Sequence, residues 1–150
     1  MNETQLLVTA YRKFLLEIGG ELKKVRDNKE YEGVADSFMD FVKSPEIGFT
    51  VDEANTLIKM YDMFCLLEPE DLPSHNAMRL MVKKSVDMKL LADAQNLSVT
   101  DFKERIKDDE IKTQERTYRY EVIKRTVETG NIVRVYGEEL EEAIKSLSND

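Results

Sequence analysis

The chain has 150 residues, of which 41% are hydrophobic and 35% are charged, and its formal net charge is −8. This composition is typical of a folded protein the size of one domain and excludes a disordered chain. The acidic sum argues against strong nonspecific binding to nucleic acid. No apolar run reaches the roughly 18 to 20 residues of a membrane span, so we expect no membrane association.

The N-terminus and the cysteine content both bear on the compartment of the protein. The first residues, MNETQLLVTAYRKF, lack the basic and long apolar segments of a secretory signal. Cys65 is the single cysteine, so an internal disulfide is impossible, and we predict a cytoplasmic protein. Since Cys65 stands between Phe64 and Leu66, we expect it to be a buried small hydrophobe.

Charge is unevenly distributed along the chain. Residues 1–71 contain 8 basic and 15 acidic side chains, a net charge of −7. Residues 72–125 contain 12 basic and 9 acidic side chains, a net charge of +3, and residues 126–150 have a net charge of −4. Only the middle-to-late segment therefore offers a positive surface to phosphates.

Apolar residues predict a long first helix. They recur at spacings of three and four: Leu7, Tyr11, Phe14, Ile18, Leu22 and Val25. Gly19 and Gly20 interrupt this helix, and such a pair permits close helix packing or a bend.

A second helix is predicted over about 34–42, with Phe38 and Phe41 facing inward. KSPEIG then breaks the chain. Thr50 and Glu53 form a capping box that opens a third helix. We expect this helix to bury Ala54, Leu57, Ile58, Tyr61 and Phe64.

The later elements are also helical. Ser74 is the predicted N-cap of a helix through about Lys84. We then expect two short helices within 90–106, a long helix over 110–128, one short strand or extended link near 132–136, and a last helix over 138–147. The prediction is a compact all-α multi-helix domain over 1–150, built from units at 17–64, 72–107 and 110–150.

Catalytic and metal-binding residues are scarce. His75 is the only histidine, and its place beside Ser74 at a helix start is explained by capping and solvent contact. Metal sites need several His or Cys ligands, and neither a phosphate loop nor a dinucleotide fingerprint is present. We therefore expect no enzymatic activity, no metal and no cofactor.

The stretch LLADAQNLSVTDFKERI, residues 90–106, has the outline of a helix-turn-helix. Ala92 is the small residue at the helix crossing, Asn96 tolerates a left-handed turn, and Leu97 is the predicted buried turn residue. Ser98 caps the second helix, with Asp101 three positions on. Phe102 and Ile106 are expected to pack the second helix against the first. The residues expected to face outward are Thr100, Asp101, Lys103, Glu104 and Lys107.

Residues 38–64 form a second candidate. Asn55, Thr56 and Lys59 are predicted to face outward, beside the less suitable Asp52. Asparagine pairs with adenine, and lysine reaches a phosphate or a guanine. For both candidates the alternative is a pair of packed helices with a mixed, solvated face.

The stretch EIGGELKKVRDNKEYEGVADSFMDFVKSPEIGFTVDEANTLIKMYDMF, residues 17–64, resembles a small domain of phage- and plasmid-encoded proteins. The following LEPEDLPSHNAMRLMV and LLADAQNLSVTDFKERI are similar to the layout after the helix-turn-helix in ParB-like partition and mobile-element proteins. The resemblance implies DNA binding or replicon regulation, although the acidic charge departs from it. The resemblance implies that the residues contacting DNA bases are Asn55, Thr56 and Lys59 on the first unit, and Thr100, Lys103 and Lys107 on the second.

Two functions follow from these patterns. The first is a small DNA-binding regulator, a homodimer through the 110–128 helix. Its phosphate contacts would be Lys83, Lys84, Arg116, Arg119, Lys124 and Arg125. The alternative is an acidic protein-binding adaptor or inhibitor that docks on a host machine and does not bind DNA itself.

Overall fold

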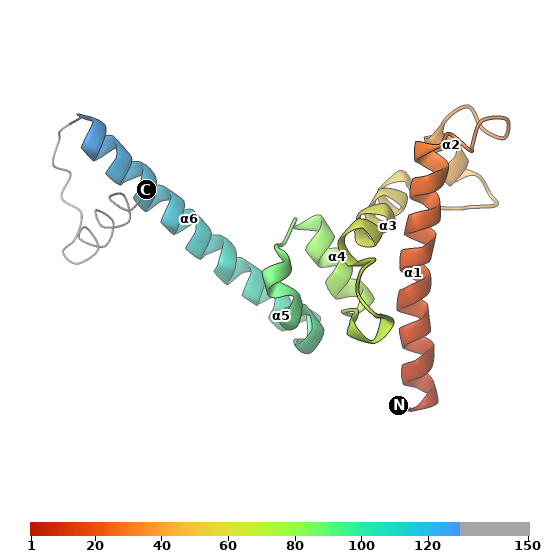
Figure 1. Ribbon diagram of the computed structural model, residues 1–150, viewed down its shortest axis with the longest axis horizontal. Coiled ribbons are helices and arrows are strands. Elements are labelled where there is room, and N and C mark those ends of the chain that lie inside the picture. The colour runs from red at the N-terminus through yellow and green to blue at the C-terminus, as the bar shows by residue number, and fades with distance from the viewer. Residues whose placement is uncertain (130–150) are drawn as a thin grey trace. The chain divides into compact units, whose positions relative to one another are not determined.

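The computed structural model describes residues 1–129, without the side chains of residues 120 and 122–129. Its helices are α1 (Glu3–Asp27), α2 (Phe38–Lys43), α3 (Val51–Phe64), η1 (Pro69–Asp71), α4 (His75–Lys83), η2 (Met88–Leu90), α5 (Leu91–Asn96) and α6 (Val99–Thr129) (Figure 1). No strand occurs over 1–129, and the all-α class is confirmed. The strand predicted near 132–136 and the helix predicted over 138–147 lie outside the described residues.

The chain divides into two compact units, residues 1–103 and 104–150. The single domain over 1–150 therefore stays a prediction. Within residues 1–129, no helix is both long enough and apolar enough to cross a membrane.

In the first unit, α3 packs against α1 (Figure 1). A Cβ atom at Gly19 would overlap the backbone carbonyl of Leu57, and one at Gly20 would lie 2.8 Å from Cε2 of Tyr61. The two glycines therefore serve close helix packing, one of the two roles predicted for them. Lys23 Nζ donates to Asp62 Oδ1 at 2.6 Å and ties the same two helices together at their surface.

The apolar row of α1 is only partly covered. The buried residues of α1 are Leu16, Gly19 and Leu22, on the side that meets α3. Phe14 and Ile18 belong to the predicted row, but their side chains are 59% and 38% exposed. The helix is confirmed, whereas most of its apolar row faces away from the core.

Helix α2 begins later than predicted, at Phe38, because the Ser37 hydroxyl accepts from the amide of Asp40 at 3.1 Å. Residues 28–34 form turns instead, and Lys29 and Gly33 have φ angles of 55° and 97°. Val42 is the fully buried residue of α2, while Phe38 and Phe41 are half-buried.

Helices α3 and α4 supply half of the buried hydrophobic residues among those that the structure describes. The predicted inward residues of α3 are buried, apart from the half-buried Tyr61. Methionines fill the rest, with Met60, Met78 and Met81 completely buried. Cys65 is exposed, so the prediction of a buried cysteine was wrong. It is the C-cap residue of α3, and one residue beyond the fully buried Phe64 a side chain is turned by about 100° around the helix.

The later helices differ from the prediction in one respect. Residues 99–129 form one helix, α6, instead of a short helix followed by another at 110. This segment contains neither glycine nor proline, so the acidic stretch Asp108–Glu110 does not interrupt it.

Candidate nucleic-acid interface

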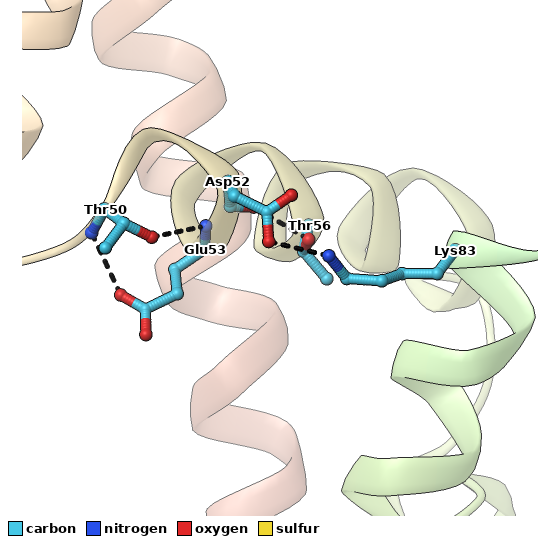
Figure 2. Close-up of polar contacts among 5 residues, drawn as sticks. All are labelled: Thr50, Asp52, Glu53, Thr56 and Lys83. Atoms are coloured by element: carbon cyan, nitrogen blue, oxygen red, sulfur yellow. Dashed lines mark hydrogen bonds and ion pairs between the residues drawn. The ribbon is translucent and has the colours of Figure 1, made fainter.

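Helix α3 is placed by a cap at its start and by α1 along one side. Thr50 Oγ1 accepts from the amide of Glu53 at 3.1 Å, and Glu53 Oε2 accepts from the amide of Thr50 at 2.9 Å (Figure 2). The predicted capping box is thus confirmed. Because α1 covers the inner side of α3, only its outer side remains available to a ligand.

The predicted readers on α3 divide into exposed and buried residues. Asn55 and Lys59 are exposed and share one side of the helix with Asp52, at spacings of three and four. Thr56 is only 8% exposed, and its hydroxyl donates to the backbone carbonyl of Asp52 at 2.7 Å (Figure 2). The prediction that Thr56 faces outward was wrong. Thr56 follows Asn55 by one residue, which rotates its side chain by about 100° around the helix, toward the core.

Three basic side chains of α3 and α4 act on the carboxylate of Asp52. Lys83 Nζ, from α4, donates to Asp52 Oδ2 at 2.6 Å (Figure 2). This hydrogen bond is the main cause of a lowered pKa of the Asp52 carboxyl, and the charges of Arg79 and Lys59 lower that pKa further. We call Lys59, Arg79 and Lys83 the α3–α4 cationic surface.

Lys59 and Lys83 were predicted from the sequence, but Arg79 was not. The signal that would have found Arg79 is its spacing of four from Lys83, which places both on one side of α4. Lys84 is exposed at the C-cap of α4, one residue beyond Lys83.

The second predicted reader set lies at the start of α6. Thr100, Lys103 and Lys107 are exposed as predicted. Lys107 Nζ pairs with Glu104 Oε1 at 3.1 Å, and Asp101 is exposed on the same turns. Carboxylates therefore accompany the cations of this set at close range.

The turn before α6 differs from the predicted helix-turn-helix. Ala92 is exposed, and the buried alanine of α5 is Ala94. Leu97 is 39% exposed, and Asn96 is not among the described residues with positive φ. The side-chain amide of Asn96 instead donates to the backbone carbonyl of Ala92 at 2.7 Å, and α5 ends at the extended C-cap residue Leu97.

Other predictions for this segment are confirmed. Ser98 Oγ accepts from the amide of Asp101 at 3.1 Å and donates to its carboxylate at 2.8 Å. Phe102 and Ile106 are buried. The start of α6 was therefore predicted correctly, but the turn geometry was not.

The remaining predicted phosphate contacts lie further along α6. Arg116 and Arg119 are exposed and three residues apart on this helix. Lys124 and Arg125 belong to α6, but their side chains lie outside the described part of the structure. None of these residues belongs to the unit that holds the α3–α4 cationic surface.

His75 has a structural contact of its own. Its Nδ1 lies 3.2 Å from the hydroxyl of Tyr11, and burial, followed by the charge of Arg79, lowers the pKa of the imidazole. Within residues 1–129, no group of His, Cys, Asp and Glu side chains is arranged to hold a metal ion.

Comparison with protein-family models, with curated proteins and with solved structures finds no match to this chain. The resemblance to ParB-like partition and mobile-element proteins stays a prediction.

Proposed function

We propose that this protein is a small DNA-binding regulator of a phage, plasmid or related mobile element, acting in the cytoplasm without catalysis. The observation that carries the proposal is the α3–α4 cationic surface, in which Lys83 contacts Asp52 and the exposed side chains of Lys59 and Arg79 add positive charge nearby. Phosphate contacts of this kind position a protein on a duplex, and neighbouring exposed residues read the bases. The mobile-element origin rests on the sequence resemblance alone.

Helix α3 is the better candidate for the reading helix. Asn55 and Lys59 project from the outer side of a helix whose inner side is fixed by α1. The α6 set is less suited, because Asp101 and Glu104 balance the charges of Lys103 and Lys107, whereas Asp52 stands beside three cations on the α3–α4 cationic surface. Asp52 opposes phosphate binding on α3, but Lys83 neutralises its charge, and Lys59 and Arg79 keep the local charge positive.

The Asp52–Lys83 ion pair does not prevent DNA binding. Both side chains are substantially exposed, at 68% and 39%. Ion pairs of this kind contribute at most about 1 kcal/mol, so a phosphate can replace the carboxylate as the partner of Lys83. We expect Asp52 to restrain nonspecific binding while leaving specific contacts possible.

A homodimer through residues 110–128 is part of the proposal. Ile111 and Tyr118 are 53% and 70% exposed and stand seven residues apart on α6. Seven residues correspond to two helical turns, so both lie on one side, as in a paired helix. Sedimentation velocity of the full chain and of Ile111→Asp tests this dimer, and equal, monomeric coefficients would contradict it.

DNA binding is tested by fluorescence anisotropy with a labelled mixed-sequence duplex at about 50 and 200 mM salt. We expect micromolar or tighter binding that weakens steeply with salt, since phosphate contacts release counterions. Selection of bound sequences from a random duplex pool extends the test to a rare operator. No binding at low salt together with no enriched sequence would reject the proposal.

A second function, that of a protein-binding adaptor or inhibitor, is favoured by a separate observation. The outer side of α1 exposes large apolar residues, including Leu7 and Phe14, at 65% and 59%. Exposed apolar surface of this extent is typical of sites for protein partners. This function does not depend on DNA binding.

A further inference from the structure

A groove lies between α1 and the segment formed by α2 and the loop after it. Its volume is about 550 Å³. Phe14, Ile18 and Val25 of α1 form one wall, and Phe41 and Phe49 belong to the other. Side chains of this size provide the deep apolar contacts that anchor a binding partner.

The groove continues into an apolar row along α1. Leu7, Phe14, Ile18 and Val25 follow one another at spacings of seven, four and seven, so they lie within about 40° of one another around the helix. At 1.5 Å per residue, this row extends for about 27 Å. An elongated row suits an extended ligand such as a helix more than a compact small molecule.

Acidic side chains accompany the apolar walls. Glu17, Glu21 and Glu46 line the groove, and no lysine or arginine is among its ten lining residues. Lys13 and Lys24 reach Glu17 and Glu21 only at 3.7 Å, through exposed side chains. Such pairs contribute little, so the carboxylates remain available to a cationic partner.

The charge of the groove decides between the possible occupants. Two copies of this face would bring carboxylates together across a two-fold axis, which is unfavourable. Residues 130–150 of the chain contain five acidic and two basic residues, so they are also like-charged with the groove. A partner with lysine and arginine beside its apolar residues has the complementary charge.

We propose that the groove between α1 and the α2–α3 loop is the docking site for an amphipathic helix of a protein partner that carries basic residues along the border of its apolar face. The apolar anchors of that helix enter between Phe14, Ile18 and Phe49, and its cations meet Glu17, Glu21 and Glu46. The inference gives the adaptor function a surface and a partner chemistry, and it is independent of the α3–α4 cationic surface.

The test uses the full chain and two labelled synthetic peptides of 18 residues. Both are amphipathic helices with the same leucines on one side, but one has lysine and the other glutamate at the positions bordering them. Anisotropy should show saturable one-to-one binding of the lysine peptide, at least tenfold tighter than that of the glutamate peptide. Equal affinities would overturn the proposal.

Two pairs of variants locate the binding site. Phe14→Ala with Ile18→Ala should lower the affinity for the lysine peptide at least tenfold. Leu66→Ala, at a side chain that is 95% exposed, should leave that affinity unchanged. Glu17→Gln with Glu21→Gln should lower the affinity for the lysine peptide about three- to tenfold. The matched control is Glu32→Gln with Glu70→Gln, two exposed carboxylates that do not line the groove. Unchanged affinity in both groove variants would overturn the proposal.

Two further measurements separate this inference from its alternatives. If the chain sediments as a dimer and Phe14→Ala with Ile18→Ala converts it to a monomer, a second copy is the occupant of the groove. That result would overturn the proposal. Lys59→Glu with Lys83→Glu should weaken DNA binding at least tenfold and leave the affinity for the lysine peptide unchanged. Because the two assays use different ligands and different variants, either surface can fail without the other.

Discussion

Helix α3 and helix α6 each begin after a hydroxyl side chain that is followed, three residues on, by an acidic residue. Thr50 and Glu53 form a full capping box, and Ser98 and Asp101 form the corresponding cap of α6. Both helices start where these pairs predict, because capping satisfies amides within one turn of the chain. Their local beginnings are thus nearly equivalent.

The surroundings of the two helices differ. Six residues of α3 are buried, between α1 on one side and α4 on another. In α6, Phe102 and Ile106 are buried, and residues 107–119 are exposed apart from the half-buried Asp109. The comparison teaches that a cap determines where a helix starts, whereas packing determines which of its sides can meet a ligand.

The largest expected effect concerns the part of α6 that is buried. Phe102→Ala removes a fully buried ring and should lower the free energy of unfolding by about 3–4 kcal/mol. Lys112→Ala, in the exposed part of the same helix, should change it by less than about 0.5 kcal/mol. Urea denaturation followed by circular dichroism measures both. Equal losses would show that the two parts of α6 do not differ as described.

The next effect concerns the close contact of α3 with α1. Gly19→Ala places a methyl group against the carbonyl of Leu57, so the helices must separate, at a cost of about 2–3 kcal/mol. Thr117→Ala, at an exposed position of α6, is the matched control and should be neutral or slightly stabilising. A Gly19→Ala variant as stable as the parent chain would contradict the close packing of α1 and α3.

Measurements of DNA binding compare the outer side of α3 with that of α6. Lys59→Glu with Lys83→Glu should weaken duplex binding at least tenfold at about 50 mM salt, equivalent to about 1.4 kcal/mol, and should reduce the salt dependence by about two counterions. Lys103→Glu with Lys107→Glu makes the same charge change on α6 and should weaken binding less than threefold. The reverse order of effects would assign reading to α6.

The smallest effect is a gain of binding. Asp52→Asn removes the carboxylate that holds Lys83 and should strengthen nonspecific duplex binding by about threefold, since fewer negative charges then face the phosphates. Asp62→Asn is the matched control, because Asp62 pairs with Lys23 instead. Anisotropy at about 50 mM salt measures both variants. Weaker binding by Asp52→Asn would show that this carboxylate takes part in DNA recognition.

Several features of the fold were predictable because their causes are local. Thr50, Ser74 and Ser98 cap helices at the predicted positions. The inward residues of α3 were also recognised, since its periodicity points to a single buried side. The length of α6 was underestimated, although the absence of glycine and proline between residues 99 and 129 was visible in the sequence.

The candidate site was only partly predictable. Asn55, Lys59 and Lys83 were recognised from their chemistry, but their grouping around Asp52 depends on how α4 lies against α3. Thr56 was misplaced because a polar residue at the border of a helix face is buried or exposed according to its neighbour. The hydroxyl of Thr56 donates a hydrogen bond to the backbone carbonyl of Asp52, so the side chain can be buried without an unpaired polar group.

By itself, the sequence determined the helical class, the starts of α3, α4 and α6, and the role of Gly19 and Gly20 as a site of helix contact or bending. The tertiary structure alone decided which side of α1 is covered, and it left Phe14 and Ile18 facing a groove lined with carboxylates. The physical reason is the range of the interactions. Capping and helix periodicity act within a turn or two, whereas burial depends on which segments, distant in sequence, supply the opposing surface.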